Sequence, residues 1–128
     1  MDYVGIVLIS HSDKVVAGIK EIIREVIQNI PLEIAGGSDE GEIGTSIDKI
    51  SRAIDQAYND KGVLLFYDLG SAKMNAELAI EMGGKKNIKI VEAPLLEGAY
   101  IGAVESNMGK TLEEVIKSVN NAFPVTVY

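Results

Sequence analysis

Short apolar runs alternate along this chain with segments whose apolar residues recur every three or four positions. The runs have the length and the turn-prone borders of strands buried on both faces of a sheet. Strands that alternate with helices predict a parallel sheet, because parallel neighbours are joined by helical crossovers. We therefore expect a doubly wound α/β fold with a mainly parallel, four-stranded sheet in the order 2-1-3-4. The predicted strands are Tyr3–Ile9, Leu32–Ala35, Gly62–Tyr67 and Ile88–Val91.

Helices are predicted between these strands and after the last one. The first spans Ser12 to Asn29, with Ser12 as its N-cap and Pro31 beyond its end. The second opens at Thr45, and Asp48 three positions later completes a capping box. Three more are expected: one from about Ser71 to Met82 before the Gly83-Gly84 pair, one starting at Pro94, and one starting at Thr111 with Glu114 in a second capping box.

The whole chain, residues 1–128, is expected to form a single domain with one core. Apolar residues make up 47% of the sequence, which is enough to bury such a core. The methionines, Met74 and Met82 among them, are expected to fill gaps in it. The last five residues, 124–128, fit either a short edge strand or a frayed end.

Charge and cysteine content narrow the possible functions. The formal net charge is -7, which disfavours nucleic acid and anionic membranes as partners and suits a basic protein. No cysteine is present, so disulfides are excluded, and we expect a cytoplasmic protein. No apolar run approaches the ~18 residues of a membrane span. With one histidine and no acidic cluster of ligand-like spacing, no metal or cofactor is expected.

The single histidine and one aspartate follow strands that should be neighbours. His11 lies two residues beyond the first predicted strand, and Asp68 directly follows the third. Chemistry in an open parallel sheet occurs beyond the carboxyl ends of the strands, so the two side chains should meet at one rim. A carboxylate that binds one ring nitrogen fixes the tautomer and leaves the other nitrogen free to attack phosphorus. We therefore predict a phosphohistidine site with His11 and Asp68 as its catalytic residues.

Two predicted helix starts lie beside this pair. Ser12 begins the helix after His11, and Gly70 and Ser71 stand at the start of the helix after Asp68. Backbone N–H groups and the helix dipole at such positions favour an incoming phosphoryl group. We expect Ser12, Gly70 and Ser71 to bind it.

The glycine-rich loop 36–44 has two interpretations. Its glycines allow backbone amides to approach a phosphate. However, the loop carries Asp39, Glu40 and Glu42, which repel phosphate, and it lacks the GxxxxGK[ST] pattern. It is either a flexible crossover loop, or else a wall of the site or a docking surface for a basic partner.

Four stretches together resemble a known family: LISHS (8–12), GGSDEGEIGTS (36–46), DLGSAKMNAE (68–77) and APLLEGAYIGAV (93–104). The family comprises the phosphotransferase subunits of bacterial dihydroxyacetone kinases driven by phosphoenolpyruvate, whose core is similar to mannose-type enzyme IIA domains of the sugar phosphotransferase system. The resemblance covers nearly the whole chain, with the stretches in the right order. It implies the doubly wound α/β fold and a homodimer.

The resemblance also implies a phosphorelay. The phosphocarrier protein HPr would phosphorylate His11, and the group would pass to ADP held by a nucleotide-binding (DhaL-type) subunit. Dihydroxyacetone would be bound by a third (DhaK-type) subunit. In related domains the aspartate matched by Asp68 hydrogen-bonds the histidine, and a serine near Ser71 lies close to the phosphoryl group. Thr45, in the stretch GTS, is placed near the phosphoryl group on the same basis.

Two other functions are considered. A mannose-type IIA component would use the same chemistry at His11 but would pass phosphate to a IIB partner for sugar import. The loop between Asp68 and Ser71 is shorter than in the mannose-type transport domains, which favours the kinase subunit. A receiver-like signalling module would be phosphorylated at Asp68. It is disfavoured, because Ser10 and Ser12 flank His11 where receivers carry an acidic pair that holds magnesium.

Overall fold

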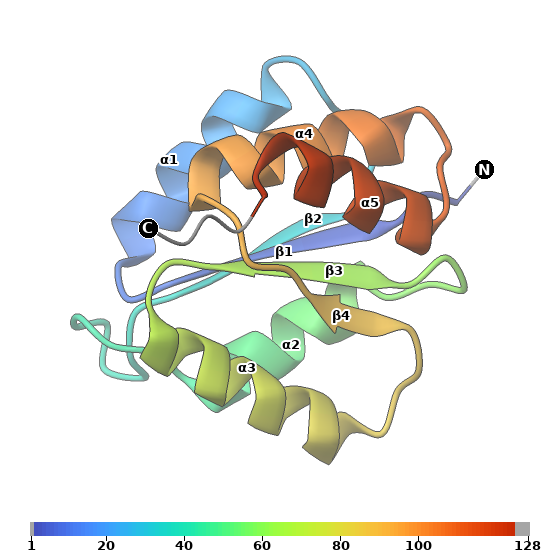
Figure 1. Ribbon diagram of the computed structural model, residues 1–128. Coiled ribbons are helices and arrows are strands. Elements are labelled where there is room, and N and C mark those ends of the chain that lie inside the picture. The colour runs from blue at the N-terminus through green and yellow to red at the C-terminus, as the bar shows by residue number, and fades with distance from the viewer. Residues whose placement is uncertain (1, 125–128) are drawn as a thin grey trace.

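A four-stranded parallel sheet forms the centre of the molecule (Figure 1). The computed structural model describes residues 2–124. The strands lie in the order β2-β1-β3-β4, which confirms the predicted α/β fold and strand order. Their bounds, each within two residues of the prediction, are β1 (Gly5–Ser10), β2 (Leu32–Gly36), β3 (Val63–Tyr67) and β4 (Ile88–Ile90).

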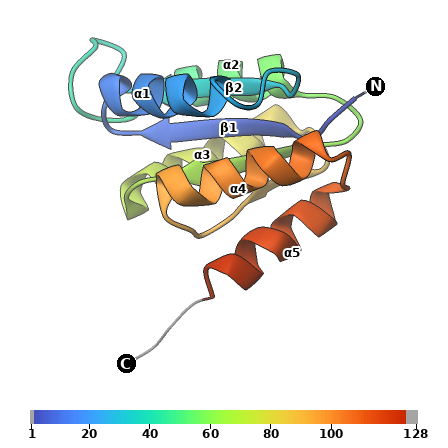
Figure 2. The same ribbon diagram turned by 90° about the horizontal axis from the view of Figure 1, so that it is seen from above.

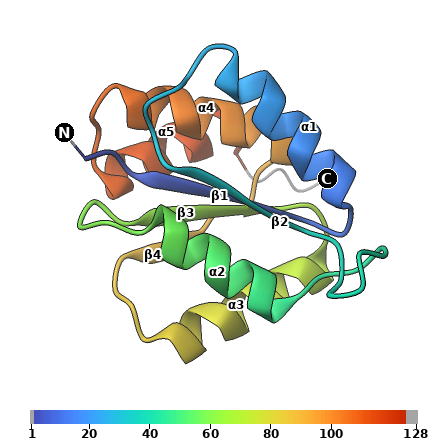
Figure 3. The same ribbon diagram turned by 180° about the vertical axis from the view of Figure 1, so that it is seen from behind.

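Helices cover both faces of the sheet, as Figures 2 and 3 show. Alternate residues of β1 point to opposite faces, so that Ile6 and Leu8 join one half of the core while Val7 and Ile9 join the other. This accounts for the nearly continuous apolar run in the sequence. One face carries α1 (Asp13–Arg24), α4 (Leu95–Asn107) and α5 (Leu112–Ala122); the other carries α2 (Ile47–Ala57) and α3 (Gly70–Gly83).

The first helix is shorter than predicted, since α1 ends at Arg24 rather than at Asn29. The N–H groups of Val26 and Ile27 both donate to the carbonyl of Ile23, which closes the chain into a tight turn. That turn brings Ile27 into the core. The apolar spacing beyond Arg24 therefore reflects burial and not a continued helix.

The start of α2 also differs from the prediction, because its N-cap is Ser46 and not Thr45. The hydroxyl of Ser46 accepts the N–H of Lys49 at 3.1 Å, while Thr45 accepts a hydrogen bond from Asn75 in α3. The capping box assigned to Thr45 and Asp48 is therefore wrong, since the threonine hydroxyl is used by another helix.

The starts and ends of the remaining helices follow the sequence closely. Thr111 and Glu114 form the predicted capping box of α5. Gly84 ends α3 in the left-handed conformation, which glycine adopts without steric cost. Pro94 is the N-cap of α4 and not its first helical residue, so α4 begins at Leu95. Of the segment predicted as an edge strand or frayed end, only Pro124 lies within the described residues.

The prediction that the methionines fill the core is wrong for Met74, Met82 and Met108, which are all exposed. Met1 lies outside the described residues. The buried face of α3 consists instead of three small side chains, Ala72, Ala76 and Ala79. These alanines fill the narrow space under α3. Met74, Leu78 and Met82 face outward, whereas Ile80 is half-buried and packs against the core.

Gly36 fixes the start of α1 relative to the sheet. A Cβ atom at this position would lie 2.7 Å from Asp13 Cα and 2.9 Å from the carbonyl oxygen of Ser12. Both neighbours belong to the backbone, so a larger residue would push β2 and α1 apart. This close approach places the first turn of α1 at the rim that follows β1.

Candidate functional site

The carboxyl ends of β1 and β3 form one rim, at the left-hand end of Figure 1. Ile9 pairs with Tyr67 in the register of these two strands. Ser10 and Asp68, the residues that follow each, therefore stand side by side, and His11 comes next in the chain. The starts of α1 and α3 and the loop between β2 and α2 reach the same rim (Figure 1).

His11 and Asp68 are in direct contact, as their positions in the sequence predicted. Nδ1 of His11 lies 3.0 Å from Oδ1 of Asp68, and the backbone N–H of His11 donates to Oδ2 at 3.0 Å. The two side chains are 20% and 23% exposed, respectively. The pair is thus shielded on one side and open on the other.

The hydrogen bonds at Asp68 favour its ionised form. Partial burial raises the pKa of the Asp68 carboxyl, but donors from His11, Ser10 and Leu69 outweigh burial and lower the pKa below its ordinary value. The N–H of Leu69 is the shortest of these bonds, at 2.7 Å from Oδ1. An ionised carboxylate only accepts hydrogen bonds, so Nδ1 of His11 must carry the proton. The lone pair of the ring is then on Nε2.

Nε2 of His11 faces Ser71, which lies in the first turn of α3. The Oγ atom of Ser71 is 2.7 Å from Nε2, and the serine is exposed. Since Nε2 holds the lone pair, the hydroxyl of Ser71 donates to it. Gly70 is the first residue of α3, and the N-cap residue Leu69 offers no side-chain cap to this helix. The helix start beside Nε2 therefore has N–H groups available for an anion.

Ser10 belongs to this network, although its place in the sequence predicted no role for it. Its hydroxyl donates to Oδ2 of Asp68 at 2.8 Å and accepts the N–H of Ser12 at 3.0 Å. The residue is only 1% exposed. In the sequence, Ser10 directly follows the predicted strand Tyr3–Ile9, and in the structure it is the last residue of β1. The signal that could have identified it is a hydroxyl directly before the histidine at a buried strand end.

The other predicted residues lie at the rim with different contacts. The hydroxyl of Ser12 accepts the N–H of Val15 at 3.4 Å and so caps α1. The hydroxyl of Thr45 binds Asn75 of α3, and this bond joins the loop to that helix. Binding of a phosphoryl group by Ser12, Gly70, Ser71 and Thr45 stays a prediction.

The glycine-rich loop touches the site through its backbone. The N–H of Gly44 donates to the carbonyl of His11 at 2.9 Å. Asp39, near the other end of the loop, accepts a hydrogen bond from the N-cap residue Ser46. These contacts favour the interpretation of the loop as a wall of the site.

Replacing Ser10 by alanine is expected to destabilise the fold by about 1–3 kcal/mol at neutral pH, because Asp68 loses a buried donor. The low pKa of Asp68 in the folded state stabilises the fold above the ordinary carboxyl pKa, and this contribution is lost as the pH falls. Without Ser10 the pKa of Asp68 should rise. The difference between wild type and Ser10→Ala should therefore shrink between about pH 7 and about pH 3, as urea unfolding at each pH would measure.

Ser106 provides a matched control for this experiment. It is fully buried, and its hydroxyl donates to the carbonyl of Val4 at 2.6 Å. Because a carbonyl does not titrate in this range, the cost of Ser106→Ala should be nearly the same at every pH. A cost of Ser10→Ala that is equally constant would show that Ser10 does not support the ionised carboxylate.

Within residues 2–124, no group of three histidine, cysteine, aspartate or glutamate side chains is placed to hold a metal ion. None of the helices in the same range is long and apolar enough to cross a membrane.

Comparison with known proteins assigns the family. The EIIA-man family model, described as the PTS system fructose IIA component, matches residues 5–116. The chain therefore belongs to the EIIA-man family. A relative from Lactococcus lactis is 45% identical over 111 residues, which cover 87% of this chain and 89% of that protein. It is named PTS-dependent dihydroxyacetone kinase, phosphotransferase subunit DhaM.

Other relatives carry similar names. A Listeria innocua protein, PEP-dependent dihydroxyacetone kinase 1, phosphoryl donor subunit DhaM, is 44% identical over 87% of this chain and 88% of its own length. The Escherichia coli phosphoryl donor subunit DhaM is 31% identical, and the match covers 88% of this chain but 25% of that longer protein. The predicted resemblance to the phosphotransferase subunits of dihydroxyacetone kinases is confirmed.

Two solved structures are similar to this chain. The crystal structure of EF1359, described as a protein of unknown function, matches with a TM-score of 0.82 and 35% identity over 94% of this chain and 95% of that one. A sigma-54 interaction domain protein from Enterococcus faecalis matches with a TM-score of 0.74 at 15% identity, over 95% of this chain and 91% of that one. At this low identity the second match shows a shared fold alone.

Proposed function

We propose that this chain is a phosphohistidine carrier that accepts a phosphoryl group from HPr and passes it to ADP on the nucleotide-binding subunit of a dihydroxyacetone kinase. The observation that carries the proposal is the orientation of His11. Nδ1 lies 3.0 Å from Oδ1 of Asp68, and Nε2 points to the exposed side chain of Ser71. The names of the relatives from Lactococcus lactis and Listeria innocua support the choice of the kinase system.

The first transfer is an in-line displacement at phosphorus. The lone pair of Nε2 forms the new N–P bond, and the N–P bond of the donor's phosphohistidine breaks, with its electron pair returning to the donor ring. Positive charge develops on the His11 ring as this bond forms. The ionised carboxylate of Asp68, on the opposite ring nitrogen, stabilises that charge.

The second transfer reverses these roles. A terminal phosphate oxygen of ADP attacks phosphorus, the bond to Nε2 breaks, and the lone pair returns to His11. Throughout, the hydroxyl of Ser71 and the start of α3 supply donors for the phosphoryl oxygens. The Ser71 hydroxyl must leave Nε2 for this purpose, and rotation about its side chain is enough for that movement.

The relay can be followed with labelled phosphoenolpyruvate. Incubation with enzyme I and HPr is expected to label the chain with phosphate that is lost in acid and retained in base. Addition of the ADP-loaded kinase subunits and dihydroxyacetone should then move the label through ATP to dihydroxyacetone phosphate. A chain that takes no label from phosphorylated HPr would contradict the proposal.

A parallel incubation separates the kinase system from sugar import. The labelled chain is mixed with a mannose-type IIB domain in place of the kinase subunits. Little transfer to the IIB domain is expected, while the kinase subunits discharge the chain rapidly. Rapid transfer to the IIB domain, with no transfer to ADP, would assign the chain to sugar import.

A further inference from the structure

Three apolar side chains on and beside α3 are exposed, and the first of them directly follows Asp68. Leu69 is 60% exposed, Met74 is 66% exposed and Leu78 is 45% exposed; we call these three residues the α3 patch. The opposite face of α3 is its buried alanine face. None of the three residues belongs to either half of the core.

The α3 patch begins where the phosphoryl group must arrive. Leu69 directly follows Asp68, and Ser71, whose hydroxyl lies 2.7 Å from Nε2, stands in the first turn of α3. With a rise of 1.5 Å per residue, Met74 lies about 4–5 Å and Leu78 about 10 Å farther along the helix axis. Positions three and seven residues beyond Ser71 lie on the same side of the helix.

A protein that delivers a phosphoryl group to Nε2 must contact the surface around it. Even a small transient interface buries about 600 Å² on each partner, which corresponds to a disc of about 14 Å radius. By the helix rise, a disc of that size centred on Ser71 extends past Met74 and Leu78 along α3. Partners cannot approach from the other side of the ring, because Asp68 occupies Nδ1.

We propose that the α3 patch is the docking face for the protein that donates the phosphoryl group to His11. This inference rests on the proposed function, since it needs a donor that is itself a protein. The donor would present an apolar patch beside its own phosphohistidine. Methionine suits such a contact, because its flexible side chain adapts to the partner's surface.

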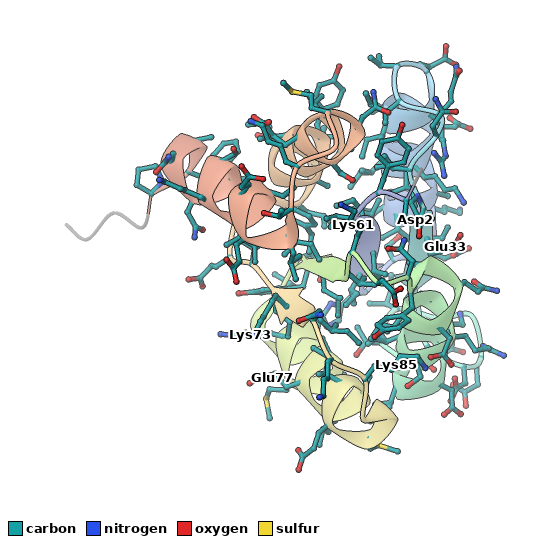
Figure 4. All side chains as sticks on the ribbon, turned by 90° about the vertical axis from the view of Figure 1, so that its right-hand side faces the viewer. Asp2, Glu33, Lys61, Lys73, Glu77 and Lys85 are labelled. Atoms are coloured by element: carbon teal, nitrogen blue, oxygen red, sulfur yellow. The ribbon has the colours of Figure 1, made fainter. Side chains whose placement is uncertain are left out.

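Charges around the α3 patch specify the donor further. The loop that borders the site is tied to α3 by the hydrogen bond between Thr45 and Asn75, and its carboxylates are exposed. Figure 4 shows Lys73 and Glu77 on the side of α3 away from α2. Acidic groups outnumber basic ones in the first turns of α1 and α2 and in the loop between β2 and α2: Asp13, Asp39, Glu40, Glu42 and Asp48 against Lys14 and Lys49. A donor with lysine and arginine around its apolar patch would complement this surface.

The test compares two methionines of equal exposure. Met74 and Met108 are both 66% exposed, but Met108 is the C-cap of α4, and α4 ends at the right-hand end of Figure 1, opposite the rim. Met74→Lys removes an apolar contact and adds a cation. The helix should be unaffected, because lysine and methionine have similar helix propensities. We expect Met74→Lys to raise the KM for phosphorylated HPr about tenfold with an unchanged maximal labelling rate. Met108→Lys should behave as the wild type.

Each other outcome overturns the inference. An unchanged KM for Met74→Lys, or a lower maximal rate with an unchanged KM, would show that Met74 does not dock the donor. An effect confined to discharge by the kinase subunits would assign the α3 patch to the acceptor. A change in oligomeric state on size exclusion would assign it to a second copy of this chain. Failure of the wild type to accept label at all would instead reject the proposed function.

Discussion

Replacing His11 by alanine is expected to abolish phosphoryl labelling of the chain, a loss of at least about four orders of magnitude. The chain contains one histidine and no cysteine, so no other imidazole or thiol can take over as nucleophile. Labelled phosphoenolpyruvate, enzyme I and HPr measure the effect directly. The fold should persist, because the His11 side chain lies at the rim and is partly exposed. Its loss should lower the free energy of unfolding by less than about 2 kcal/mol.

Replacing His11 by asparagine removes the nucleophile but keeps a hydrogen-bond donor for Asp68. Its amide offers an N–H donor near the place of Nδ1 and nothing at the place of Nε2. His11→Asn should therefore retain a bond to Asp68 and still take no label. Acid-labile phosphate on either variant would contradict the assignment of His11. Base-labile phosphate on the wild type would instead indicate an acyl phosphate on Asp68, as in a receiver-like module.

The sequence was sufficient to predict that His11 and Asp68 meet. Both follow apolar runs, and the alternation of strands and helices determines a parallel sheet in which the carboxyl ends of neighbouring strands share one rim. The pairing of Ile9 with Tyr67 brings the two residues together in the structure. The order and the ends of the strands were enough to predict this contact, and hydrophobic periodicity indicates both.

Hydroxyl groups were harder to assign. Thr45 and Ser46 are adjacent, and either can cap a helix, so the choice depends on a partner in another element. Asn75 of α3 takes the hydroxyl of Thr45 and leaves Ser46 to cap α2. No role was predicted for Ser10 for a similar reason, because the acceptor of its hydroxyl, Asp68, belongs to another part of the fold.

The orientation of α3 also could not be read from its sequence. Large apolar residues are usually buried, so Met74 and Met82 were placed in the core. The helix instead buries Ala72, Ala76 and Ala79. The apolar period identifies a helix but not which of two apolar sides faces the sheet, and here both sides are apolar. The unexpected exposure of Met74 is what the docking inference rests upon.

Replacing Asp68 by asparagine is expected to slow phosphorylation of His11 by about 10²–10⁴-fold while leaving measurable labelling. The amide is neutral and cannot stabilise the charge that grows on the ring. Its N–H₂ group can also donate to Nδ1, which moves the ring proton to Nε2 and blocks the nucleophile. The initial rate of labelling at saturating phosphorylated HPr measures the effect on the chemical step.

Asp55 offers a matched control, because it is an exposed carboxylate that pairs with Lys85 at 2.8 Å, far from the rim. Figure 4 labels Lys85 near the end of α3 opposite to the site. Asp55→Asn should change neither the labelling rate nor the KM, since surface ion pairs contribute little. If Asp68→Asn is labelled as fast as this control, the carboxylate has no part in the transfer. A slower rate with an unchanged KM places the role of Asp68 in the reaction itself, because donor docking is then intact.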